Sequence, residues 1–215
     1  MLEPPALRFT HHEYHQFYAW CKASVSEMTA AKAALETYGP DYEDRDLPRR
    51  AWKEVFALEE QVEKNSVLAP VLAVMAAEQL IVTYAMQRLS HEMISTLTYI
   101  DRLDTVAKWE AFPLMTCGKH LGADSEALRE LRIQVRQRNA FSHPKPLIVS
   151  IGSDEHMKRV EDKIDGNAKQ RFSIACAAPR TVDLLAKELM ALDKHRSTRR
   201  ACKMAGVVPV RRSGA

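Results

Sequence analysis

The chain has 215 residues, a formal net charge of +3 and a hydrophobic content of 46%, which fits one soluble globular domain with a buried core. Only seven glycines are present, and the abundance of Ala, Leu, Met, Glu, Lys and Arg favours helices over strands. The cysteines are scattered without a CxxC pair, which argues against a disulfide framework and a zinc site. They are Cys21, Cys117, Cys176 and Cys202.

The distribution of charge separates the C-terminus from the rest of the chain. Residues 194–215 carry seven Lys and Arg and no acid, so the remaining body is net acidic. By this net charge we expect the C-terminus, rather than the body as a whole, to attract phosphate. The sequence therefore predicts a basic, flexible tail over 196–215.

Neither a signal peptide nor a membrane span is predicted. The N-terminus lacks a basic region followed by an apolar one. The longest apolar stretch, 67–86, is interrupted by Glu78, Gln79 and Thr83, which makes it too polar to cross a bilayer. We therefore expect a cytoplasmic protein without a membrane partner.

In the N-terminal half, capping residues and prolines predict where helices begin and end. Thr10 is suited to cap the first helix, and Gly39-Pro40 is suited to stop it. Pro48 suits the first turn of the second helix, and Ser66 suits the cap of a third, which is apolar nearly all round and therefore central. These helices are predicted over 10–38, 48–64 and 66–92.

In the C-terminal half, the fourth helix is predicted to end near Pro113, and Asp124 to cap the fifth. Pro144 and Pro146 end that fifth helix. A brief extended segment is predicted at 147–151, and no strand-rich region is evident. The sequence thus predicts one all-α domain over 1–195, a multi-helix up-and-down bundle. Its later helices are predicted over 101–111, 125–142, 154–164 and 180–194.

The predicted helix over 125–142 carries an arginine at the end of its apolar face. A guanidinium on a core-facing stripe is unfavourable unless it is paired or opens onto a cleft or a partner surface. Its arginine neighbours Arg129, Arg132 and Arg136 can point to solvent. The stripe, by steps of three and four, comprises Leu128, Leu131, Val135, Arg138 and Ser142.

His143 follows Arg138 by five positions, which places it about 140° away around a helix. The two side chains therefore do not converge within one intact helix. Either Pro144 releases His143 from helical geometry, or a second copy of the helix packs against the first across a two-fold axis. We favour the second arrangement, a homodimer whose cleft holds two arginines and two histidines.

Such a cleft has the groups needed to cleave RNA by internal attack of a 2′-hydroxyl, without a cofactor or metal. His143 would transfer a proton, because imidazole titrates near neutrality. Arg138 would stabilise the additional negative charge of the transition state. Asn139 would hold the imidazole tautomer or the scissile phosphate. The other histidine cluster, His11, His12 and His15, lacks metalloprotease spacing and predicts no metal site.

The motif Arg138-Asn139-x-x-x-His143 at the end of a bundle helix resembles the signature of the HEPN superfamily. The resemblance covers about 66–146. It also includes an apolar helix with Glu78, a Lys108-Trp109 pair followed by a proline, Gly118-Lys119, and the motif running into His-Pro-Lys-Pro.

The resemblance to the HEPN superfamily implies an α-helical bundle that dimerises with the motif at the interface. Many relatives are metal-independent endoribonucleases in toxin–antitoxin, phage-defence or RNA-processing systems, and a cognate antitoxin or partner protein accompanies some of these roles. Other members are inactive binding modules. Lys145 occupies the position at which some toxin members carry a tyrosine.

Two alternatives remain open from the sequence. Arg138 can form a structural ion pair with the buried acid Glu78, and His143 can simply cap its helix. The chain would then be a non-catalytic module that binds a nucleotide, a nucleic acid or a partner protein. In the catalytic interpretation, Glu78 and Lys145 are candidate supporting residues beside Arg138, Asn139 and His143.

Overall fold

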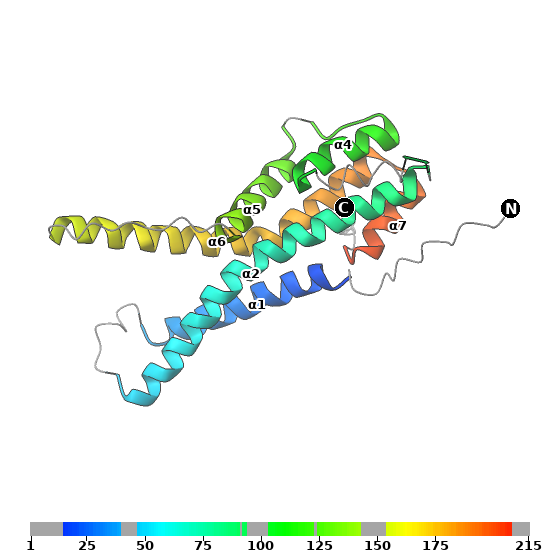
Figure 1. Cartoon of the computed structure of the whole chain (residues 1–215). Coiled ribbons are helices and arrows are strands. Elements are labelled where there is room, and N and C mark those ends of the chain that lie inside the picture. The colour runs from blue at the N-terminus through cyan, green and yellow to red at the C-terminus, as the bar shows by residue number, and fades with distance from the viewer. Residues whose placement is uncertain are drawn as a thin grey trace, which may run out of the picture.

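The computed structural model describes residues 15–39, 47–90, 92–93, 103–122, 124–142 and 154–207. These residues form helices and no strands (Figure 1), so the predicted all-α bundle is confirmed. The six described helices are α1 (His15–Glu36), α2 (Arg49–Arg88), α4 (Thr105–Cys117), α5 (Glu126–Ser142), α6 (Asp154–Leu192) and α7 (Arg196–Met204).

Helix α2 is the centre of the bundle and packs against all five other described helices. Its second half presents many buried alanines, which allow neighbouring helices to approach closely, together with fully buried Leu80, Ile81 and Tyr84. The predicted core residue Trp109 of α4 is confirmed, because its side chain is buried and its indole N–H donates to the carbonyl of Ala77, 3.0 Å away.

The predicted break between two helices at Ser66 is wrong, because α2 runs through it without interruption. The Ser66 hydroxyl donates to the carbonyl of Glu63 at 2.7 Å instead of capping a new helix. The preceding residue, Asn65, is also buried, and its Oδ1 accepts from the hydroxyl of Ser24 on α1 at 2.7 Å. Packing against α1 therefore overrides the local capping signal.

The predicted separation of 154–164 from 180–194 is also wrong, since both belong to the single helix α6, which contains Gly166 and Pro179. Proline costs a helix about 3 kcal/mol or more, and burial of an apolar stripe on both sides of Pro179 offsets that cost. The first half of α6 extends beyond the bundle (Figure 1). The buried stripe comprises Ala175, Ala178, Val182, Leu185 and Leu189.

Three other boundaries differ from the prediction. Helix α4 begins after Asp104, whose carboxylate accepts from the N–H of Ala107 at 2.9 Å, and continues through buried Pro113 to Gly118, whose φ is 70°. Ser125 rather than Asp124 caps α5, because its hydroxyl oxygen accepts from the N–H of Leu128 at 3.0 Å. The predicted Thr10 cap and the segment 147–151 lie outside the described residues.

Part of the predicted basic tail is a packed helix. Residues 196–204 form α7, with Thr198, Ala201 and Cys202 buried and the His195 side chain at its N-cap. Residues 208–215 lie outside the described part of the chain. A flexible tail thus cannot begin at 196.

Helix α2 also contains the one stretch, within the described chain, that is long and apolar enough to cross a membrane. Of that stretch, 56% is buried inside the bundle. This burial is typical of the core helix of a soluble protein.

Candidate functional site

The motif arginine lies at the C-terminal end of α5, where the helix leaves the core. Arg138 is partly exposed and Asn139 is exposed. The Nε and Nη2 atoms of Arg138 donate to Oδ1 of Asn139 at 3.1 and 3.0 Å. The structure therefore brings these two predicted site residues together at the surface. His143 and Lys145 lie outside the described residues.

The predicted apolar stripe of α5 is confirmed up to Val135. Leu128 and Leu131 are buried and Val135 packs against the core, whereas Arg138 emerges at the edge of the bundle. Gln134 is fully buried, and its Nε2 donates to the carbonyl of Ile174 on α6 at 3.0 Å. This contact fixes α5 against α6 one turn before the motif.

Glu78 is not brought to Arg138. Its carboxylate forms an ion pair with Lys108 of α4 and accepts from the hydroxyl of Thr105 at 3.0 Å. The Lys108 side chain is only 2% exposed, whereas that of Glu78 is 37% exposed. The alternative of an ion pair between Glu78 and Arg138 is therefore wrong, because the partner of Glu78 is Lys108, and this pair joins α2 to α4.

The N-terminal end of α5 is held by a carboxylate from α6. Glu188 accepts from the hydroxyl of Ser125 at 2.6 Å and from the N–H of Ala127 at 3.1 Å. A negative charge at this position also favours the positive end of the helix dipole. Because α5 is anchored to α6 at both its start and its middle, the position of Arg138 is set by the rigid bundle.

Sequence reasoning missed a polar cluster at the junction of α6 and α7. Asp193 is 7% exposed and accepts from the hydroxyl of Tyr84 at 2.9 Å, from Nε of Arg88 at 3.0 Å and from the N–H of His195 at 2.9 Å. Its one sequence signal is an acid at a helix C-terminus, which the helix dipole disfavours. The cluster ties the last turn of α6 to the end of α2.

Burial acts to raise the pKa of Asp193, but the hydrogen bonds from His195 and Tyr84 and the charge of Arg88 outweigh it, so the pKa is lowered. A lowered folded-state pKa contributes stability above the unfolded value of about 3.9 that is lost as the pH falls through the folded value. Asp193→Asn is expected to lower the free energy of unfolding at pH 7 by about 2 kcal/mol.

Urea unfolding at a series of pH values checks this prediction. The difference between wild type and Asp193→Asn should shrink as the pH drops below about 4, where the unfolded carboxyl takes up a proton, and should vanish below the lower folded-state value. A difference that stays constant down to the lowest pH would contradict the assigned network.

The buried thiols are not suited to nucleophilic catalysis. Burial raises the pKa of Cys21 and of Cys202 to about 12, and a thiol at that pKa is protonated at neutral pH. Within the described ranges, no group of three or more His, Cys, Asp and Glu side chains is placed to hold a metal ion.

Comparisons of the chain with protein-family models, curated proteins and solved structures found no match.

Proposed function

We propose that the protein is a metal-independent endoribonuclease that acts as a homodimer, with Arg138, Asn139 and His143 as its site residues. The position of Arg138 carries the proposal. Its guanidinium is partly exposed at the end of α5, contacts Asn139, and has no acidic partner among the described residues. With no carboxylate among the described residues bound to it, the guanidinium is available to bind a phosphate.

The alternative in which Arg138 serves only as the structural ion-pair partner of Glu78 does not agree with the structure. Glu78 pairs with the buried ammonium of Lys108, on another helix. Arg138 therefore does not pair with Glu78, and its partly exposed guanidinium is available to an anionic ligand.

In the proposed reaction, the ribose 2′-oxygen attacks the adjacent phosphorus and the bond from phosphorus to the 5′-oxygen breaks. The products are a 2′,3′-cyclic phosphate and a 5′-hydroxyl. His143 transfers the proton between these oxygens, and Arg138 stabilises the charge on the phosphoryl oxygens. Asn139, already hydrogen-bonded to Arg138, orients the guanidinium toward the phosphate.

The spacing of the motif is the reason to favour a homodimer over release of His143 from the helix by Pro144. Arg138 belongs to α5, which remains helical to Ser142, so a histidine continuing that helix would be about 140° away around its axis. Two-fold packing of the C-terminal ends of α5 would bring the arginine of one subunit to the histidine of its partner.

The test is cleavage of a labelled single-stranded RNA by the purified protein in excess chelator. We expect cutting, with cyclic phosphate ends, and no cutting of the matching DNA strand, because DNA lacks the 2′-hydroxyl. RNA that is bound but left intact would reject the catalytic proposal and favour a non-catalytic binding module. Cleavage of the DNA strand would reject the proposed chemistry.

A further inference from the structure

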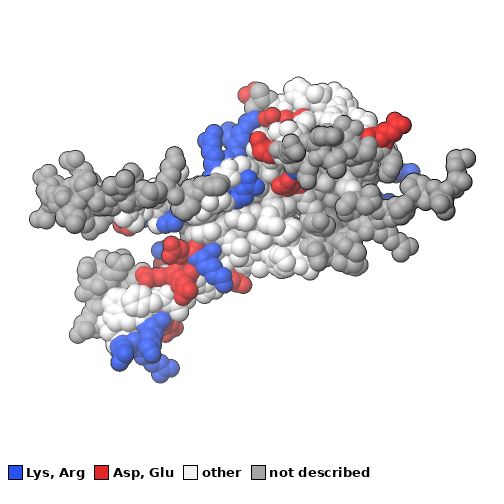
Figure 2. Space-filling model, in the orientation of Figure 1, with Lys and Arg blue, Asp and Glu red and all other residues white. Residues whose placement is uncertain are grey.

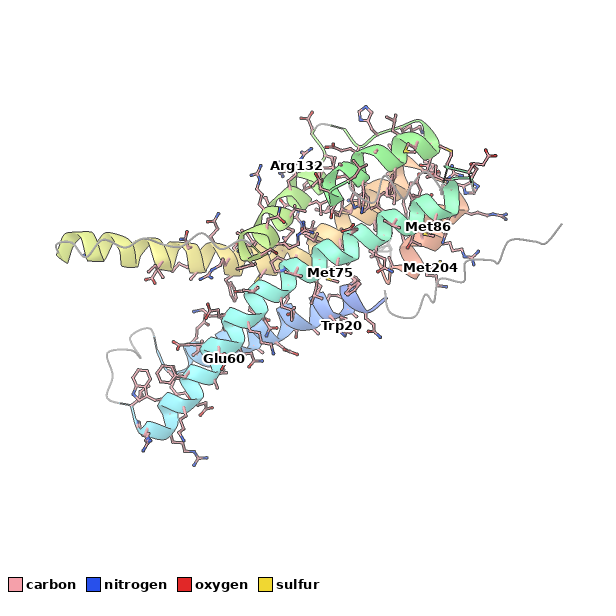
Figure 3. All side chains as sticks on the ribbon, in the orientation of Figure 1. Trp20, Glu60, Met75, Met86, Arg132 and Met204 are labelled. Carbon is pink, nitrogen blue, oxygen red and sulfur yellow. The ribbon has the colours of Figure 1, made fainter. Side chains whose placement is uncertain are left out.

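A row of arginines lies along the exposed side of α5. Arg129, Arg132 and Arg136 are separated by three and four residues, which places them on one helical face. Asn139 continues that spacing by three more residues, so the row ends at Asn139, whose Oδ1 accepts from Arg138 on the other side of the helix. Lys and Arg side chains gather over this part of the molecule in Figure 2, and Figure 3 shows Arg132 projecting from α5.

The acids around this row leave most of its charge available. Arg132 pairs with Glu110 of α4 at 2.7 Å, and the two side chains are 40% and 50% exposed, so the pair is weak. Arg129 and Arg136 are exposed and form no ion pair within the described part of the chain. The one acid on α5 between these arginines, Glu130, lies about 100° off the row.

From this row we infer that Arg129, Arg132 and Arg136 form a phosphate-binding track that leads single-stranded RNA to Asn139 and, through its hydrogen bonds, to the guanidinium of Arg138. The inference rests on the proposed function for the identity of the strand. The three positions rise about 11 Å along the helix, or about 5 Å for each of two intervals, which suits three consecutive phosphates of a strand more extended than the 3.4 Å per nucleotide of duplex DNA. A planar guanidinium binds a phosphate through two parallel hydrogen bonds.

The track also restricts how two subunits meet. Two such rows facing each other would oppose like charges without a compensating anion. A dimer contact across the row is therefore disfavoured, whereas a contact at the C-terminal end of α5 would leave the row open to a strand that enters the shared cleft.

The test measures binding of a 2′-O-methyl oligouridine, which cannot undergo internal attack, over a series of salt concentrations. The track variant is Arg129→Gln/Arg132→Gln/Arg136→Gln. The matched control, Arg49→Gln/Arg50→Gln/Lys53→Gln, removes three exposed cations from the far end of α2. Each lost phosphate contact lowers the slope of log K against log salt by about 0.7, so the track variant should lose about 2.

A second pair of variants tests the role of Arg132. Glu110→Gln releases Arg132 and should tighten binding several-fold, whereas Glu63→Gln, an exposed acid on α2, should leave affinity unchanged. Thermal unfolding of each variant shows that the fold is intact.

The inference is supported if the slope of log K against log salt falls by about 2 in the track variant and stays unchanged in the control variant. It is overturned if the slope falls equally in both triple variants or in neither. Because the probe is not cut, the outcome is independent of catalysis. A wild type that binds through the track but cuts no RNA would reject the proposed function alone. If the wild type cuts RNA but the track variant keeps the wild-type salt dependence of binding, the track alone is rejected.

Discussion

Alanine at Arg138 or at His143 is expected to lower the rate of RNA cleavage by a factor of about 10² to 10⁴. Loss of proton transfer by a positioned imidazole costs about 10²–10⁴, and loss of one charge-stabilising donor costs about 10²–10³. The rate is measured in single turnover with protein in saturating excess, so that weaker binding does not contribute. Arg138 is partly exposed, so Arg138→Ala should change the free energy of unfolding by less than about 0.5 kcal/mol.

The matched control for this prediction is Arg136→Ala, which removes an exposed arginine two residues earlier on the same helix. It should weaken RNA binding but keep the saturated rate, since Arg136 belongs to the track and not to the reacting site. The double variant Arg138→Ala/His143→Ala should be no slower than the slower single variant, because the two groups act as a unit. Equal rates for Arg138→Ala and Arg136→Ala would contradict the assignment of Arg138.

Glu78→Ala is expected to destabilise the protein by about 2–3 kcal/mol, because it leaves the ammonium of Lys108 buried without its carboxylate. The Lys108 side chain is 2% exposed, whereas Glu78 is 37% exposed, which moderates the effect. The loss of the hydrogen bond from Thr105, which is also buried, adds to it. Urea unfolding monitored by circular dichroism gives the free energies.

Two controls test whether the burial of the Lys108 ammonium accounts for the expected loss of unfolding free energy in Glu78→Ala. Glu110→Ala removes the acid of the exposed pair with Arg132 and should cost less than about 1 kcal/mol. Glu78→Leu/Lys108→Met removes both charges and should be less destabilising than Glu78→Ala, because the buried ammonium is removed together with the carboxylate that pairs with it. A cost for Glu78→Ala no larger than that for Glu110→Ala would show that the pair is not structural.

The existence of the helices could be predicted from periodicity and composition, but several of their ends could not. At Ser66 and Pro179 the local signals for a helix end are strong, yet α2 and α6 continue through both residues. In each case the residues on both sides are buried against another helix. Burial at these positions outweighs the capping or proline preference, and only the tertiary structure reveals it.

In the candidate site, too, the features set by helical spacing could be predicted and the contacts between helices could not. The stripe of α5 correctly predicted that Arg138 follows a buried face, because helical spacing alone determines which residues share a side. The partner of Glu78 could not be found in this way. Its ion pair with Lys108 depends on α4 crossing α2 near that residue, and nothing in the spacing of either helix specifies that crossing.

The central claim is that the arginine of one subunit and the histidine of its partner act on the same phosphodiester bond. It is tested most directly by mixing Arg138→Ala protein with His143→Ala protein, allowing subunits to exchange, and measuring RNA cleavage in excess chelator. Each variant alone should cut slowly, at the reduced rate given above, whereas the mixture should cut much faster, because a mixed dimer rebuilds one complete pair across the interface. A mixture no faster than the separate variants while the wild type cuts RNA, or a single variant that cuts at the wild-type rate, would contradict the shared site.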